Sequence, residues 1–241
     1  MSESELRHAW NRNAEAWIEW AGTPRHDHFF WEFNLPTFLE IVPKAGTLTV
    51  DIGCGEGRVG RALADLGHRV IGVDGSESLA RAAFRASKPM PAIAADAAEL
   101  PLRDDVADLA IAFMSPHDID DVPNAFRETN RVLREGSIFC LAFIHPFLSA
   151  GTAYLKERKY EDVEELDGLT MTFNSAHRPL SYYIEALGGA GFCVDTLREP
   201  IPTDNYLRDH PGDTWMESLP LYVHLRCQKM QRSVLPLKTV P

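Results

Sequence analysis

Four glycines fall within the twelve residues TVDIGCGEGRVG, at positions 49–60. An apolar stretch precedes them and a pattern of helical spacing follows. Because glycine lacks a Cβ and tolerates positive φ, its backbone amides can approach a ligand closely. The N-terminus of the following helix adds partial positive charge at the same place. The stretch therefore predicts a loop that binds an anionic or polar ligand.

Two phosphate-binding loops can be compared with this stretch. A P-loop requires Lys and then Ser or Thr after its final glycine, whereas Arg58 follows Gly57. A dinucleotide-binding loop fits formally, because Gly55, Gly57 and Gly60 match the pattern GxGxxG. Asp74 lies 19 residues beyond Gly55, where such a site carries its ribose-binding acid. The P-loop is excluded and the dinucleotide remains an alternative.

Asp51, Asp74 and Asp96 each come at or just after the end of a predicted strand. In an open α/β sheet the carboxyl ends of neighbouring strands line one crevice. Asp51 would repel a pyrophosphate there but can meet an ammonium group. Asp74 can accept from two ribose hydroxyls, and Asp96 from an exocyclic amine. These three groups without a phosphate describe S-adenosylmethionine, which we favour over a dinucleotide as the cofactor.

Two histidines are candidates for catalytic contacts. His117 follows the fourth predicted strand and His145 the fifth, so both are expected at the ligand edge of the sheet. Either can act as a general base or contact an acceptor, and the alternative for each is a loop histidine bonded to nearby backbone. A sulfonium is already an activated electrophile, so alignment of the reactants can supply up to ~7–11 kcal/mol without a strong base.

The surrounding sequence alternates between strand and helix patterns. Strands are expected at 48–52, 69–74, 92–95, 106–113 and 137–144, and helices at 57–67, 76–86 and 122–135. Such alternation implies right-handed crossovers and a parallel sheet covered on both faces. After the fifth strand the alternation stops. A helix at 178–191 and two strands, at 192–200 and 219–229, end the pattern as a hairpin-like pair.

The segments outside this alternation suggest three further parts. Residues 5–20 and 28–42 predict aromatic-rich helices, and residues 1–45 are interpreted as a helical lid. Residues 46–230 form the ligand-binding domain, with an insertion at about 146–178, and residues 231–241 look like a loosely attached tail. Within the insertion, Asp167 and Gly168 precede apolar residues of period two, which predicts a hairpin.

Three stretches together resemble class I S-adenosylmethionine-dependent methyltransferases of the small-molecule, type 11-like group. They are VDIGCGEGRVGRALADLGHRVIGVDGS, ADAAELPLRDDVADLAIAFMSPHDIDD and RETNRVLREGSIFCLAF. The resemblance spans roughly residues 28–228, and its most specific features are the acid before the glycine loop, the acid of the second strand and the Asp-Ala pair. The family usually has Pro-Gly-Gly near REGSIF, where Gly136 alone remains.

The resemblance implies a fold and a set of roles. The fold would be a Rossmann-like, doubly wound, mostly parallel seven-stranded α/β sheet of order 3-2-1-4-5-7-6, with the last strand antiparallel. The reaction would be methyl transfer to an oxygen, nitrogen or carbon atom of a small molecule by in-line displacement. The residues implied to bind the cofactor are Asp51, Gly53, Gly55, Gly57, Asp74, Gly75, Asp96, Ala97 and Ser115.

Charge and composition restrict the classes of molecule that the protein is expected to bind. The formal net charge is −11, so nucleic acid is an unfavourable partner. No signal peptide or membrane span is recognised, and the four cysteines form no CxxC pair, which fits a soluble protein in the cytoplasm and no metal. Cys140 and Cys193 lie in apolar runs and are predicted as core residues. A monomer or homodimer that acts on a small molecule is expected, and a non-catalytic cofactor-binding subunit is a further alternative.

Overall fold

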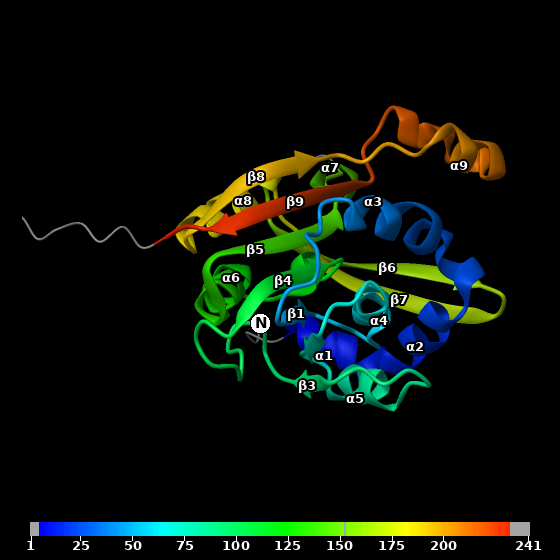
Figure 1. The fold of residues 1–241 in the computed structure, drawn as a ribbon. Helices are drawn as coiled ribbons and strands as arrows, with labels where there is room; N and C mark the ends of the chain where they lie inside the picture. Colours follow the sequence, from blue (N-terminus) through cyan, green and yellow to red (C-terminus); the bar gives the residue numbers. More distant parts are fainter. Residues whose placement is uncertain (1–4, 152, 232–241) are drawn as a thin grey trace, which may run out of the picture.

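A seven-stranded sheet forms the centre of the computed structural model, which describes residues 5–151 and 153–231 (Figure 1). Its strands are β1 (Thr49–Ile52), β2 (Val70–Asp74), β3 (Ala92–Ala94), β4 (Ala107–Phe113), β5 (Leu133–Ile144), β8 (Phe192–Arg198) and β9 (Tyr222–Lys229). They lie in the order β3-β2-β1-β4-β5-β9-β8. Neighbouring strands from β3 to β5 pair in parallel, and β9 is antiparallel to β5 and β8. The predicted order and the antiparallel last strand are confirmed.

Helices cover both faces of the sheet. The helices α3 (Leu35–Leu39), α4 (Arg58–Asp65) and α5 (Glu77–Arg85) contribute to one apolar cluster, in which Phe38 and Leu63 are fully buried. The helices α6 (Val122–Val132) and α8 (Leu180–Gly189) contribute to the other, with Phe126 and Tyr183. β1 is buried along its whole length between the two clusters. This double cover fixes the carboxyl ends of the strands as one rigid edge.

The N-terminal segment differs in detail from the two expected helices. Its elements are α1 (Glu5–Arg12), α2 (Ala14–Gly22), the 3-10 turn η1 (Pro24–Asp27) and the π-helical turn η2 (Phe29–Asn34), which runs into α3. Asn13 separates the first two helices. Pro36 lacks an amide hydrogen and cannot complete the normal helical bonds, and the Leu35 amide reaches back five residues to the carbonyl of Phe30.

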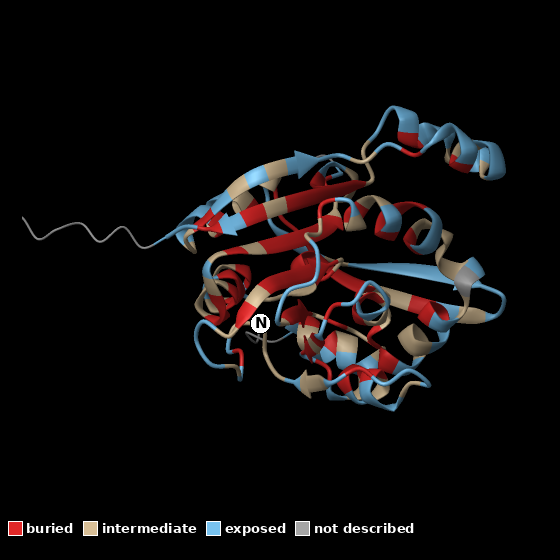
Figure 2. Cartoon of the chain, in the orientation of Figure 1, coloured by how far each residue is buried: buried red, intermediate tan, exposed pale blue. Residues whose placement is uncertain are grey.

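A long hairpin projects beside these helices, as predicted from the Asp-Gly turn (Figure 1). β6 (Arg158–Leu166) pairs antiparallel with β7 (Leu169–His177). Asp167 and Gly168 adopt φ values of 55° and 82°, as a tight two-residue turn requires. β6 is exposed along nearly its whole length, whereas the second half of β7 is buried (Figure 2). The hairpin therefore has an outer strand open to solvent and an inner strand against the domain.

The remaining elements lie in connections. They are the 3-10 turn η3 (Pro116–Asp118), α7 (Pro146–Ser149), α9 (Asp204–Asp209) and η4 (Pro211–Glu217). Cys140 is buried as predicted, but Cys193 is exposed because it lies on the edge strand β8, so its prediction as a core residue is wrong. No helix in residues 5–151 and 153–231 is long and apolar enough to cross a membrane. The predicted tail lies, from residue 232 on, outside the described residues.

Candidate functional site

The glycine loop joins β1 to α4 in a conformation that ordinary residues disfavour. Gly53, Gly55 and Gly57 have φ values of 71°, 56° and 90°. A Cβ on Gly53 would lie 2.3 Å from the Cβ of Ser115, so this position excludes any side chain. The loop thus passes directly against the end of β4. Gly57 is the N-cap of α4, and its amide donates to the carbonyl of Cys54 at 2.9 Å. This amide is therefore already used within the loop.

Asp51 is a buried carboxylate at the end of β1. Its Oδ2 is inaccessible to solvent and has no hydrogen-bond partner among the described residues. Burial, and then the charges of Asp74 and Glu56, raise the pKa of Asp51 to about 7, although the amide of Gly60 acts in the opposite direction. A buried carboxylate oxygen without a partner is costly unless a ligand supplies a donor or a positive charge.

Asp74 ends β2 and holds the glycine loop in place. Its Oδ2 accepts from the Gly55 amide at 2.7 Å, and its Oδ1 accepts from the Ser76 amide at 2.8 Å. Burial raises the pKa of Asp74 to about 6, although both amides act in the opposite direction. Each oxygen keeps a further lone pair for a ligand. Ser76 also caps α5 through its hydroxyl, which accepts from the Leu79 amide.

Asp96 follows β3, is half-exposed and pairs with a residue of the first helix. It accepts from the Ala98 amide at 2.9 Å and from Nη1 of Arg7 at 3.1 Å. Gly75 makes room for this arrangement, because a Cβ there would lie 2.8 Å from Cγ of Arg7. Ala97 and Gly75 both line the same cavity as Asp96. Arg7 was not predicted, since only the fold brings α1 to this edge of the sheet.

Ser115 and His117 follow β4 on the opposite side of the glycine loop. Ser115 donates its hydroxyl to the carbonyl of Ile52 at 2.6 Å. The side chain of His117 is 8% exposed, with Nε2 3.6 Å from Oδ1 of Asp118 and Nδ1 without a partner in the described part of the chain. Burial, and then the nearby charge of Arg178, lower the pKa of His117 to about 3. The imidazole is therefore neutral near pH 7 and a weak base.

Asp118 is a cavity residue to which the sequence pattern assigned no role. Its side chain is 15% exposed, and its Oδ1 accepts from the hydroxyl of Ser175 on β7 at 2.7 Å. Burial raises the pKa of Asp118 well above its usual range, against the effects of the Ser175 hydroxyl and Arg178. The signal that was available is its position three residues beyond Ser115, at the carboxyl end of β4.

His145 is not brought to this site. It caps α7, with Nδ1 accepting from the Phe147 amide at 3.1 Å, and its Nε2 lies 2.9 Å from Oε1 of Glu199. It does not line the cavity that contains His117. Gly57 also lies outside the cavity lining. The other predicted residues meet at one place, whereas His145 serves the connection after β5.

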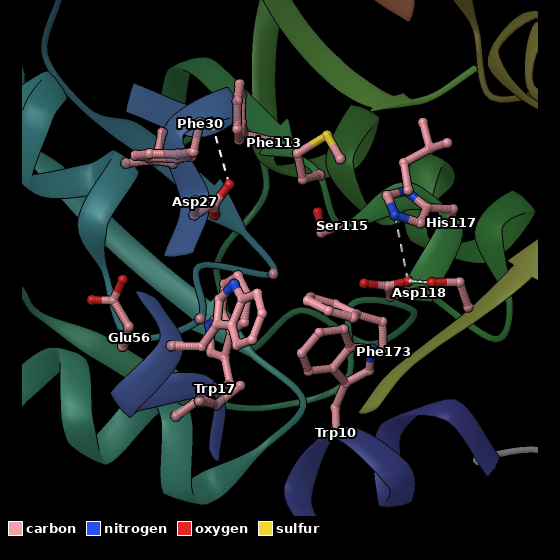
Figure 3. Close-up of a pocket in the computed structure, with 18 of the residues that line it drawn as sticks. Trp10, Trp17, Asp27, Phe30, Glu56, Phe113, Ser115, His117, Asp118 and Phe173 are labelled. Carbon is pink, nitrogen blue, oxygen red and sulfur yellow. Dashed lines mark hydrogen bonds and ion pairs between the residues drawn. The ribbon is translucent and has the colours of Figure 1, made fainter. Parts of the chain in front are cut away.

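The predicted residues surround a cavity of about 670 Å³, large enough for a nucleoside ligand and a second molecule (Figure 3). Ser115 and His117 lie on one side of it, with Trp10, Trp17 and Phe173 across the opening. Trp17 contacts Trp10 and Phe173 edge-to-face, with ring centroids 5.7 and 6.1 Å apart. The aromatic side comes from α1, α2 and β7, so the N-terminal segment and the hairpin together cover the edge of the sheet.

Comparison with known proteins identifies the domain. Residues 50–141 match the family model described as a methyltransferase domain. This chain contains a class I S-adenosylmethionine-dependent methyltransferase domain. A probable S-adenosylmethionine-dependent methyltransferase of Mycolicibacterium smegmatis is 36% identical over 99 residues, which are 41% of this chain and 38% of that protein. The cofactor that such a domain implies is S-adenosylmethionine.

Solved structures agree on the fold of the methyltransferase domain. A methyltransferase from Mesorhizobium loti superimposes with a TM-score of 0.64 and 25% identity, over 80% of this chain and 96% of that one. The cyclase SpnF has a TM-score of 0.65 and 18% identity, over 95% and 96% of the two chains. Alignments with the curated relatives cover only 32% to 48% of those proteins. The substrates of those relatives therefore cannot be transferred to this chain by similarity.

Proposed function

We propose that the protein transfers the methyl group of S-adenosylmethionine to a small-molecule acceptor. The observation that carries this proposal is the buried carboxylate of Asp51, which lines the cavity beside the glycine loop. An ammonium group in the cavity compensates the charge of that carboxylate, whereas a pyrophosphate would bring a second negative charge to it. The amino-acid end of S-adenosylmethionine carries such a group, and the rest of the cavity offers acids for its ribose and adenine.

The roles of the cofactor-binding residues follow from their positions. Asp51 would hold the ammonium, Asp74 the ribose hydroxyls and Asp96 the exocyclic amine of adenine, beside the backbone of Ala97. Gly53, Gly55, Gly75 and Ser115 also line the cavity and would contact the cofactor. Gly57 would act through the shape of the loop, since its amide is already bonded to Cys54.

Catalysis by this site would rest on positioning. When bound, S-adenosylmethionine supplies a methyl group already activated by a sulfonium. The chain has to hold the acceptor in line with that group and exclude water, and an aromatic cover suits both tasks. His117 is neutral and a weak base, so we assign it contact with the acceptor rather than proton removal.

Binding and transfer test the proposal separately. Calorimetry with S-adenosylhomocysteine and with NADH compares the proposed cofactor with the dinucleotide alternative. We expect S-adenosylhomocysteine to bind and NADH to show no saturable binding, and the reverse result would refute the proposal. A labelled-methyl assay against a metabolite library then tests transfer. Binding without transfer to any acceptor would favour a non-catalytic subunit, because related folds also serve other chemistry, as the cyclase SpnF illustrates.

Two hydrogen bonds connect the N-terminal segment, which we interpret as a lid, to the hairpin. Trp10 donates its Nε1–H to the carbonyl of Asn174 at 2.9 Å, and Asn13 donates its Nδ2–H to the carbonyl of Thr172 at 3.0 Å. Both bonds join the first helices to β7 across the cavity. We propose that they keep α1 and α2 closed over the bound cofactor.

Replacing both donors is expected to open this cover. The double variant Trp10→Phe, Asn13→Ala removes two bonds of about 1 kcal/mol each, so S-adenosylhomocysteine should dissociate about 30-fold faster. Stopped-flow measurement of tryptophan fluorescence reports the rate. Arg12→Ala, at an exposed position of α1, is the matched control. An unchanged dissociation rate in the folded double variant would show that these helices are not a lid.

A further inference from the structure

We infer that the methyl acceptor is an amine, protonated in solution, whose ammonium group binds Asp118 after passing the acidic face of β6. This inference rests on the proposed function and names the substrate class of the same site. It follows from the charges of the cavity, from the surroundings of Asp118 and from the aromatic rings opposite it.

The cavity cannot easily accept an anion. Ten acidic side chains and three arginines line it. Each arginine already has a carboxylate partner: Arg7 pairs with Asp96 at 3.1 Å, Arg25 with Asp167 at 2.8 Å and Arg58 with Asp27 at 2.7 Å. Nη1 of Arg58 has no hydrogen-bond partner in the described part of the chain, but it is inaccessible to solvent, and the charge of each lining arginine is already paired. A carboxylate or phosphate would enter this space against a net negative field.

β6 contributes unpaired carboxylates to the cavity mouth. Asp162 and Glu164 are exposed and line the cavity, and their carboxylates have neither a hydrogen bond nor an ion pair within the described part of the chain. Asp162 lies opposite Phe173 in the hairpin register, so both residues share one face of the hairpin. A cation approaching along this face meets negative charge first and aromatic surface next. Both attract ammonium groups.

Asp118 is placed to receive that cation. Ser175 holds its carboxylate from one side, and Figure 3 shows the side chain facing the interior, across from Phe173 and Trp10. Arg178, the charge behind it, donates from Nη2 to the carbonyls of Ile119 and Asp120 at 2.9 and 3.1 Å. A carboxylate in such an apolar space binds an ammonium more strongly than a neutral hydroxyl, because the charged hydrogen bond is poorly screened.

The chemistry balances with Asp118 as the proton acceptor. The ammonium gives one proton to the carboxylate, which frees the nitrogen lone pair. That lone pair forms the new N–C bond while the C–S bond breaks and its electrons stay on sulfur. The products are a methylated ammonium, a neutral thioether and a protonated Asp118, which returns its proton to solvent. Burial raises the pKa of Asp118, which makes its carboxylate a stronger base, and the positive charge of the bound ammonium favours the ionised form that accepts the proton.

Three matched probes test the inference by binding. Phenethylamine, 2-phenylethanol and 3-phenylpropanoate share one ring and differ in charge. Calorimetry on the full chain with saturating S-adenosylhomocysteine should show the amine binding at least tenfold more tightly than the alcohol, and the carboxylate most weakly. The inference is overturned if the alcohol or carboxylate binds as tightly as the amine, or if the amine does not bind.

Two variants and one control locate the effect. Asp118→Asn should reduce the tenfold preference for the amine to less than threefold. Asp162→Asn with Glu164→Gln should weaken amine binding severalfold at low salt and little at high salt. Glu161→Gln removes one charge from the other face of β6 and should change neither value. Equal effects of control and test variants would overturn the inference.

The affinity for S-adenosylhomocysteine separates the two proposals. If that ligand binds and the amine preference is absent, the acceptor class is wrong and the methyltransferase proposal stands. If S-adenosylhomocysteine itself fails to bind, the proposed function is wrong, and with it the acceptor class that rests on it.

Discussion

Replacement of Asp74 by alanine is expected to weaken the binding of S-adenosylhomocysteine at least about 100-fold. Each hydrogen bond from a ribose hydroxyl to this carboxylate is worth about 1.5–3 kcal/mol, and 1.4 kcal/mol corresponds to a factor of ten. The same side chain accepts from the amides of Gly55 and Ser76, so its loss also releases the glycine loop. Titration calorimetry at pH 7.5 measures the change.

The control for this variant lies three residues further along the chain. Glu77→Ala removes an exposed acid of α5 whose ion pair is with Arg81, and it should leave the affinity unchanged. Asp74→Asn keeps the shape of the side chain but offers one acceptor oxygen where the two amides need two, and it should lie between alanine and the wild type. Unaltered affinity in folded Asp74→Ala would mean that the ribose lies elsewhere.

The strand pattern carried most of the information about the fold. Alternating apolar strands and helices left few topologies, and the Asp-Gly turn at 167–168 predicted the hairpin because both residues tolerate positive φ. The expected helix at 28–42 was less accurate. Pro36 interrupts its hydrogen bonds, and the segment splits into 3-10, π and α turns that no simple periodicity describes.

The three aspartates were predictable because strand ends in a parallel sheet converge by geometry alone. Arg7 and Asp118 were not identified, because their contacts join residues 89 and 57 positions apart in the sequence. His145 shows the converse limit. The end of a strand fixes the backbone position of the next residue but not the direction of its side chain. The side chain of His145 points to the N-terminus of α7 and caps it.

A pH dependence of cofactor binding is the second large effect that we expect. Burial and neighbouring charges raise the pKa of Asp51 to about 7, whereas an ammonium ligand requires its ionised form. The affinity for S-adenosylhomocysteine should therefore fall as the pH is lowered from 7.5 to 5.5, on the order of 20-fold for a group that titrates near neutrality. Asp74, with a pKa raised to about 6, adds to the fall at its lower end.

Asp51→Asn separates this effect from general acid instability. The asparagine cannot ionise, so the variant should bind S-adenosylhomocysteine weakly and lose the part of the pH dependence that comes from Asp51. In the free protein, Asp51 has a higher pKa in the folded state than in the unfolded state. Its contribution to the free energy of unfolding is fully present below the unfolded pKa, declines as the pH rises, and is lost once the pH has passed about 7. The variant should therefore gain thermal stability over the wild type between pH 4 and 7 and keep that gain above pH 7. If the difference in melting temperature between the variant and the wild type does not change with pH across this range, a group other than Asp51 has the raised pKa.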